Sequence, residues 1–242
     1  MERQGYRGPE PRALFENAEL LALDKPAGLV VHSDGRTEEP ALVDWLALRD
    51  PALAEVGGTH ALDMGRTVPR FGVLHRIDRD TSGVILVAKT QEAFGFFQQQ
   101  FLERTVEKTY DAIVWGTFSE SEGTIDLPIG RSRRDFRQWT VPPDARGTLR
   151  LALTHWRVLK AGAKHAHLEV RPKTGRTHQI RVHLKAIGHP LVADQRYGGA
   201  PALDLTRLAL HARAITIRLP DASELHIEAP LPPDLAEAVG KL

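Results

Sequence analysis

The residues best suited to chemistry in this sequence lie together in one short polar stretch, residues 75–83, which reads His-Arg-Ile-Asp-Arg-Asp-Thr-Ser-Gly. Within nine residues it carries two carboxylates, two guanidinium groups, two hydroxyls and an imidazole. Carboxylates and imidazoles act as nucleophiles or as general acids and bases, and a guanidinium group keeps a nearby carboxylate ionised. Residues 84–88 follow as an apolar run rich in β-branched residues, which predicts a buried strand that holds the loop still.

The same stretch also fits an ordinary charged turn between strands. In that interpretation Asp78 and Arg79 form a surface ion pair worth less than about 1 kcal/mol. Thr81, Ser82 and Gly83 have the composition of a turn, since hydroxyls bond back to nearby backbone and glycine tolerates conformations that other residues resist. A second stretch, much later in the chain, favours chemistry over this alternative.

That second stretch covers residues 172–184, Pro-Lys-Thr-Gly-Arg-Thr-His-Gln-Ile-Arg-Val-His-Leu, and continues with Gly-His-Pro-Leu-Val-Ala-Asp at 188–194 and Tyr-Gly-Gly at 197–199. Together with earlier and later blocks it closely resembles the RluA-type RNA pseudouridine synthases. The other blocks are Asp-Lys-Pro-Ala-Gly-Leu-Val-Val-His at 24–32, residues 75–83, Lys-Thr-Tyr at 108–110 and Arg-Leu-Ala-Leu-His-Ala at 207–212. Blocks in family order and at family-like spacing thus span residues 20–211.

The resemblance implies a role for individual residues. Asp78 matches the catalytic aspartate, Tyr110 the tyrosine stacked against the target base, and Arg181 the basic partner of Asp78. Arg76 matches the arginine that fills the space left in the RNA when the uridine swings out. Ile77 stands where the family usually has leucine, a swap that conserves volume. The expected apolar residues of the substrate pocket are Ile180 and Leu210.

Arginines and aromatics alternate over residues 131–139, a mixture that suits an RNA-facing loop. The alternative is a charged hairpin whose aromatics, Phe136 and Trp139, turn into the core. The expected RNA-binding residues of the whole chain are Arg76, Arg133, Arg134, Arg137, Arg176 and His178.

Conversion of uridine to pseudouridine breaks the bond between uracil N1 and ribose C1′, turns the base, and joins C5 to C1′. No electron or group comes from outside, so the expected reaction needs no cofactor and no metal. His178 and His183 are five residues apart, so on a helix they point to different faces and make a poor metal pair.

Two other functions stay open from the residues. A binding module of the same fold could have lost its activity, although the intact set of Asp78, Tyr110 and Arg181 argues against this. A hydrolase of nucleosides or glycosides could use Asp78 and Asp80 as paired carboxylates, whereas the family resemblance makes Asp80 a loop residue.

Composition narrows the class of protein. The chain has 242 residues, of which 42% are hydrophobic and 26% charged, as in soluble globular proteins. The absence of cysteine excludes disulfides, thiolate catalysis and cysteine-ligated metal sites. We see no signal peptide and no apolar run of membrane-spanning length, and expect a cytoplasmic monomer with no membrane contact and no obligate protein partner. Since the net charge is only +1, an RNA-binding protein of this composition must gather its arginines on one face.

The elements that must position these residues follow from periodicity. Helices are expected over 42–48 and over 91–103 with Thr90 as N-cap, from the Thr-Gly-Arg-Thr at 174–177 through Ala186, and at the C-terminus. Residues 50–70 read as a loop. Strands are expected within 18–32, at 84–88, 108–116, in part of 123–130, and at 151–159, 166–170, 208–219 and 224–228.

These elements predict an α/β (α+β) fold with a mixed, largely antiparallel sheet flanked by helices, the pseudouridine synthase fold. We expect a flexible arm over residues 1–14 and one catalytic domain over residues 15–242. An S4-type RNA-binding domain is not expected, because the family blocks begin near residue 20.

Overall fold

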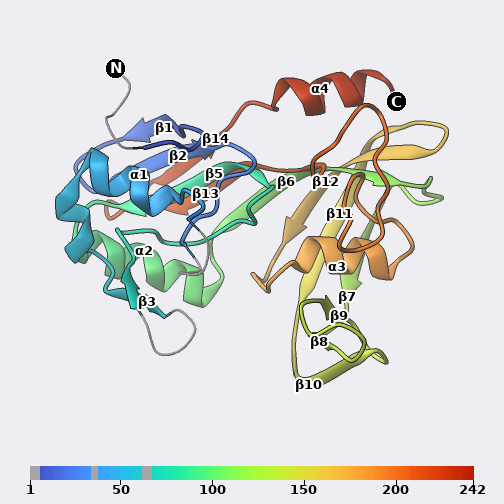
Figure 1. The fold of residues 1–242 in the computed structure, drawn as a ribbon, viewed down its shortest axis with the longest axis horizontal. Helices are drawn as coiled ribbons and strands as arrows, with labels where there is room; N and C mark the ends of the chain where they lie inside the picture. The colour runs from blue at the N-terminus through green and yellow to red at the C-terminus, as the bar shows by residue number, and fades with distance from the viewer. Residues whose placement is uncertain (1–5, 34–37, 62–66) are drawn as a thin grey trace. The chain divides into compact units, whose positions relative to one another are not determined.

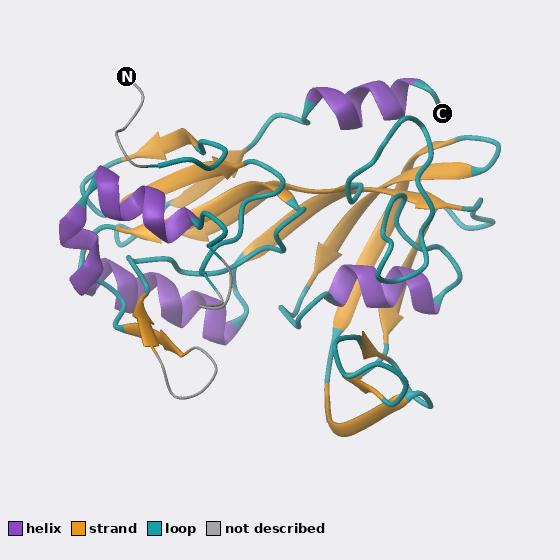
Figure 2. Ribbon diagram, viewed as in Figure 1, coloured by secondary structure: helices purple, strands orange, loops and turns teal. Residues whose placement is uncertain are grey.

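The computed structural model of this chain describes residues 6–33, 38–61 and 67–242. The chain divides into two compact units: residues 1–106 with 214–229, and residues 107–213 with 230–242. The expected catalytic domain, residues 15–242, covers parts of both. Strands are mostly antiparallel and helices flank them, so the predicted α+β class is confirmed (Figures 1 and 2).

The first unit is built on strands β1 (Arg12–Glu16), β2 (Leu20–Lys25) and β5 (Ser82–Ala88), which pair antiparallel in that order. Strand β13 (Leu210–Arg218) continues the order after β5, and β14 (Glu224–Glu228) pairs with β13. Every residue of β5 is buried, as expected for the strand that follows the polar stretch.

Helices α1 (Leu42–Arg49) and α2 (Gln91–Glu103) complete the core of the first unit. The hydroxyl of Thr90 accepts a hydrogen bond from the Ala93 amide at 3.1 Å, which confirms the predicted N-cap. Phe94 and Phe97 of α2 are buried in the same apolar cluster as the strands. Burial of this face stabilises both helices, since helices of these lengths are marginal alone.

The second unit carries the antiparallel strands β6 (Glu107–Trp115), β12 (His165–Pro172), β11 (Leu153–Ala161) and β7 (Glu122–Asp126), in that spatial order. Helix α3 (Gln179–Ala186) packs on the face that presents Ala112 and Val114, whereas α4 (Pro233–Gly240) packs in the cluster of Ile113. Because neighbouring strand residues point to opposite faces, the two helices cover opposite faces of this sheet (Figure 2).

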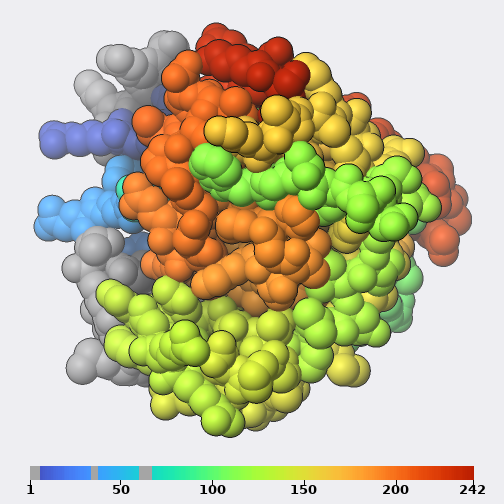
Figure 3. All heavy atoms as spheres, turned by 90° about the vertical axis from the view of Figure 1, so that its right-hand side faces the viewer, coloured from blue at the N-terminus to red at the C-terminus, as the bar shows by residue number. Residues whose placement is uncertain are grey.

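A separate three-stranded antiparallel sheet projects from the second unit. Its order is β10 (Ala145–Arg150), β8 (Ile129–Ser132) and β9 (Trp139–Thr140). In the space-filling view these residues form the yellow-green mass at the lower edge of the molecule (Figure 3). This sheet holds the predicted arginine-rich loop of residues 131–139.

Three expectations about the elements need correction. The expected loop over residues 50–70 contains the short helix η1 (Pro51–Glu55) and the paired strands β3 (Thr59–Ala61) and β4 (Thr67–Pro69). Strand β10 is not among the predicted strands. The expected arm, residues 1–14, overlaps β1, because the backbone from Arg12 pairs with β2; its residues 1–5 lie outside the described part of the chain.

Candidate active site

The loop that carries Asp78 lies in the first unit, directly before β5. The Thr81 amide donates a hydrogen bond to the Asp78 carbonyl at 3.2 Å, so the turn lies at residues 78–81 and not at the predicted Thr-Ser-Gly step, whose Ser82 and Gly83 already belong to β5. The Asp78 side chain is half-buried, whereas Arg79 and Asp80 are exposed. The next strand begins at Ser82 and is wholly buried, so a rigid element anchors the loop at its C-terminal end.

Lys25 also holds the loop that carries Asp78, through hydrogen bonds from its ammonium group to backbone carbonyls. Its side chain is fully buried at the end of β2, and its ammonium donates to the carbonyls of Pro26 at 2.9 Å, Leu29 at 2.7 Å and Arg79 at 3.0 Å. The Gly28 amide donates to the same Arg79 carbonyl at 2.9 Å. The residue that follows Asp78 is therefore held by two donors, one at the end of β2 and one in the turn that follows it.

His75 also has a structural part in this loop. Its ring nitrogen Nε2 accepts a hydrogen bond from the Leu86 amide of β5 at 3.1 Å, so this nitrogen carries no proton. The ring stacks on Phe101 of α2 with centroids 5.0 Å apart. The imidazole of the polar stretch thus ties the loop to the strand that follows it.

Arg79 and Asp80 have the character of surface loop residues. The Arg79 guanidinium lies 2.7 Å from Glu39 and 3.8 Å from Asp80, with side-chain exposures of 56% for Arg79 and 53% for Asp80. Arg76, the residue expected to enter the RNA, is exposed. The loop therefore has the exposed charges expected of a surface turn, and between them lies one half-buried carboxylate, that of Asp78.

Tyr110 lies in the second unit, on β6 opposite Val170 of β12. It is half-buried and packs against the apolar cluster that contains both expected pocket residues, Ile180 and Leu210. Ile180 is 6% exposed and Leu210 4% exposed. The three residues selected from distant parts of the sequence thus share one cluster.

Arg181 lies on α3 and forms a two-pronged ion pair with Asp194. Its Nε and Nη2 donate to the two Asp194 oxygens at 2.9 and 2.8 Å, and the two side chains are 12% and 1% exposed. The guanidinium also lies over the ring of Tyr197, 5.0 Å from its centroid. A buried pair with this fork geometry fixes where the positive charge of Arg181 stands.

Tyr197 links this pair to the arginine-rich sheet. Its hydroxyl accepts a hydrogen bond from the Trp139 amide at 3.2 Å and lies 2.8 Å from Nδ1 of His178. Burial raises the pKa of the Tyr197 hydroxyl, so the group stays protonated and can donate to His178. His178, expected to bind RNA, therefore also positions Tyr197.

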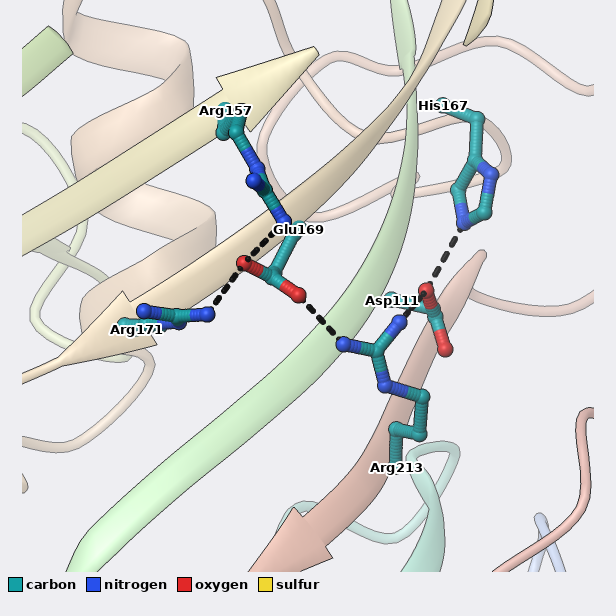
Figure 4. A network of polar contacts seen from close by, with 6 residues as sticks. All are labelled: Asp111, Arg157, His167, Glu169, Arg171 and Arg213. Atoms are coloured by element: carbon teal, nitrogen blue, oxygen red, sulfur yellow. Dashed lines mark hydrogen bonds and ion pairs between the residues drawn. The ribbon is translucent and has the colours of Figure 1, made fainter. Parts of the chain in front are cut away.

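On the opposite face of the sheet from Tyr110 lies a network of charged side chains around two buried carboxylates, Asp111 and Glu169 (Figure 4). Asp111 accepts from His167 at 2.8 Å and from Arg213 at 3.2 Å, and Arg213 also pairs with Glu169. Glu169 further pairs with Arg157 at 3.1 Å and with Arg171 at 2.8 Å. Since Tyr110 and Asp111 are neighbours on β6, this network holds the strand that presents Tyr110.

The remaining expected RNA-binding residues lie in the second unit. Arg133 donates to the Ala145 carbonyl at 3.2 Å, and Arg176 to the Leu151 carbonyl at 3.1 Å. Arg134 and Arg137 are paired with carboxylates, Arg134 with Asp144 at 3.4 Å and Arg137 with Asp135 at 3.0 Å. Of the two aromatics in this loop, Trp139 packs partly against a buried cluster, whereas Phe136 is 71% exposed and does not turn into the core.

Sequence reasoning missed Lys25 and Asp194 as positioning residues. Lys25 ends a strand whose only other charged residue is Asp24, and a lysine is buried only when several acceptors surround its ammonium group. Asp194 ends a block that was noted for its resemblance, thirteen residues after Arg181. The sequence around Lys25 or Asp194 does not show which residue each one contacts, because the loops that bring the partners together have no periodic pattern.

Comparison with known proteins fits this geometry. Residues 19–186 match the family model of RNA pseudouridylate synthase. An uncharacterized RNA pseudouridine synthase of Synechocystis is 40% identical over 222 residues, covering 90% of this chain, and this chain spans 65% of that relative's length. Ribosomal large subunit pseudouridine synthase D of Xanthomonas campestris is 38% identical over 259 residues, covering 100% of this chain and 73% of the relative.

Among solved structures, human RNA Pseudouridylate Synthase Domain Containing 1 superposes with a TM-score of 0.74 at 27% identity, covering 95% of this chain and 87% of the human chain. The chain therefore belongs to the RNA pseudouridylate synthase family, and the resemblance to its RluA-type members is confirmed. Members of this family are isomerases that act on RNA. None of the described helices is long and apolar enough to cross a membrane.

Proposed function

We propose that this chain isomerises uridine to pseudouridine in ribosomal or transfer RNA, with Asp78 as the catalytic carboxylate. The observation that carries the proposal is that the family match, residues 19–186, includes Asp78, Tyr110 and Arg181. The fixed backbone around Asp78 supports it, because a catalytic group must be held in place by its surroundings.

The reaction needs one ionised carboxylate. The bond between N1 and C1′ breaks, the uracil turns, C5 bonds to C1′, and the proton on C5 leaves, so the atoms of the nucleotide are conserved apart from proton exchange. Asp78 either attacks the nucleoside covalently or takes a ribose proton. Both routes fail when the carboxylate is replaced by an amide.

Arg181 and Tyr110 take the other two roles. We assign to Arg181 the role that the family resemblance implies, the basic partner that keeps the carboxylate of Asp78 ionised, and the Asp194 fork holds its guanidinium. Tyr110 offers its ring to the displaced uracil. Its half-buried position against Ile180 and Leu210 supports a stacking role, since these residues back the ring with apolar side chains.

Arg76 takes the place of the uridine in the RNA. A uridine within a stem must leave the stack to be modified, which costs a few kcal/mol unless another group fills the gap. Arg76 is exposed, two residues from Asp78, and its side chain is long enough to enter. Among the other expected RNA contacts, Arg133, Arg134 and Arg176 bind phosphates.

The substrate is an RNA of the translation apparatus. Since the Xanthomonas relative is named for the ribosomal large subunit, large-subunit ribosomal RNA is the first substrate to test. We place the activity in the cytoplasm and assign it to the monomer, with no obligate protein partner, no cofactor and no metal.

The proposal is tested with RNA labelled with tritium at uracil C5. We expect tritium release by the wild-type chain and none by Asp78→Asn, while Asp80→Asn in the same loop keeps release within a few-fold of wild type. Mapping of pseudouridine in ribosomal and transfer RNA from cells with and without the protein then gives the site. Release of free uracil or sugar in place of an isomerised nucleotide contradicts the proposal and favours a hydrolase.

A further inference from the structure

The three-stranded sheet of the second unit encloses a hollow of about 670 Å³ that the proposed reaction does not use. Its lining consists of two aromatics, four arginines and two small residues: Phe136, Trp139, Arg131, Arg137, Arg146, Arg150, Gly147 and Thr148. A volume of this size lies within the roughly 300–1,000 Å³ of small-molecule sites, so it can take one nucleotide. The lining contains no carboxylate.

The arrangement of charge across the strands favours an anion. Arg146 of β10 lies directly opposite Arg131 of β8 in the antiparallel register. Like charges in that position destabilise a sheet unless a counter-charge sits between them. In the described part of the chain, neither Arg146 nor Arg150 has a carboxylate partner, whereas Arg137 is held by Asp135 at 3.0 Å.

The aromatic part of the lining favours a base. Arg131 lies over the ring of Trp139, with 4.2 Å between the guanidinium carbon and the ring centroid, and it donates to the Phe136 carbonyl at 3.0 Å. Phe136 itself is 71% exposed, one of the largest exposures among the large apolar side chains that the structure describes. An exposed ring beside unpaired guanidinium groups is the combination that binds single-stranded nucleic acid.

We propose that this hollow holds one unpaired nucleotide of the RNA other than the target uridine, with its base stacked on Phe136 and its flanking phosphates paired with Arg146 and Arg150. This inference rests on the proposed function for the identity of the RNA. It assigns binding to Arg146 and Arg150, and leaves Arg137 as a residue that orders the loop through Asp135. Substrates with a single-stranded segment next to the modified stem are therefore preferred.

The test measures binding without turnover. Fluorescence anisotropy follows a labelled oligouridine of twelve nucleotides and an abasic oligomer with the same number of phosphates. We expect Phe136→Ala to weaken oligouridine binding at least about fivefold, the lower end of the loss of one stacked base, and to leave the abasic oligomer unchanged. Phe136→Trp keeps a stacking ring and is expected to restore binding.

The double variant Arg146→Ala/Arg150→Ala is expected to weaken both oligomers. It also lowers the slope of log K against log salt by about 1.4, at roughly 0.7 for each phosphate contact on a single strand. The matched control is Arg104→Ala/Arg218→Ala, which removes two exposed guanidinium groups from the first unit. The proposal is overturned when the pocket variant and the control lose the same affinity, or when Phe136→Ala weakens the abasic oligomer equally.

Failure of this inference is distinguishable from failure of the proposed function. Asp78→Asn is expected to bind both oligomers as the wild type does, because it leaves the hollow unchanged. If the pocket variants bind both oligomers normally and the wild type releases tritium, the proposed nucleotide site is wrong and the proposed reaction stands. If the pocket variants lose binding and the wild type releases no tritium, the proposed nucleotide site is supported and the proposed isomerisation of uridine is wrong.

Discussion

Two groups of arginines in the second unit have the same chemistry and opposite surroundings. Arg157, Arg171 and Arg213 all reach carboxylates, and Glu169, which accepts from all three, has a side chain only 7% exposed. Arg146 and Arg150, on the three-stranded sheet, have no carboxylate partner in the part of the chain that the structure describes. A count of arginines in the sequence cannot separate the two groups, because pairing is decided by strand register.

The largest expected effect comes from breaking the paired group. Glu169→Gln keeps the volume and removes the charge shared by three guanidinium groups, and we expect it to lower the free energy of unfolding by about 2 to 3 kcal/mol. Urea denaturation measures this loss. The control is Glu120→Gln, on an exposed loop, where the change should stay within about 0.5 kcal/mol. An equal effect in both variants means that the buried network adds nothing.

The next effect concerns Arg181, which is paired with Asp194 as the arginines of the first group are paired with carboxylates, and for which we propose a part in the reaction. Asp194→Asn keeps one acceptor oxygen and loses the fork, so Arg181 is held less firmly. We expect kcat for tritium release to fall about tenfold, equivalent to about 1.4 kcal/mol, with a smaller change in KM. An unchanged kcat shows that the fork does not position Arg181 for the reaction.

A smaller effect of opposite sign is expected for the unpaired group. Arg146→Ala removes repulsion with Arg131 across the strands, so the free energy of unfolding should stay the same or rise by about 0.2 to 1 kcal/mol at low salt. The gain should shrink as salt is added, because salt screens exposed charges. Arg213→Ala, in the paired group, is expected to lower stability under the same conditions. Equal losses from both variants contradict the comparison.

The smallest expected effect concerns two buried histidines, one bonded to a carboxylate and the other to neutral groups. His167 bonds to the Asp111 carboxylate, whereas His183 bonds to the Thr154 hydroxyl and the Leu127 carbonyl, and burial lowers the pKa of His183 below its ordinary 6.5. The unfolded chain then binds the proton more readily than the folded one, so His183 stabilises the fold above about pH 6.5 and this contribution is lost as pH falls through its lowered pKa.

Urea denaturation of the wild type and of His183→Asn between pH 7.5 and 5 checks this. We expect the wild type to lose more stability than the variant over that range, since the variant has no ring to protonate. Parallel curves for the two chains mean that His183 does not titrate differently in the folded and unfolded states.

Local patterns predicted the fold where one face of an element is buried. Helix α2 was predicted with its observed bounds, because Phe94 and Phe97 repeat at helical spacing after a capping Thr90. Strand β10 was missed since five of its six residues are exposed, which leaves no alternation to detect. The hairpin β3–β4 within the expected loop has strands of only three residues each, too short for a pattern.

The residues of the candidate site were predicted from sequence motifs, whereas the residues that hold them in place were not. Asp78, Tyr110 and Arg181 stand in blocks that the family resemblance picks out. The Lys25 contact with the Arg79 carbonyl joins residues 54 positions apart, and the Arg213 contact with Asp111 joins residues 102 apart. Such contacts depend on which strands become neighbours, which periodicity within a single segment does not determine.

The three carbonyls gathered by Lys25 have a consequence for how RNA meets this protein. A backbone already set in its working shape loses little freedom when a ligand arrives, and ordering one residue otherwise costs about 1–2 kcal/mol. The aspartate loop is then ready before the encounter, and selectivity among RNAs must come from the shape that the nucleic acid itself can adopt.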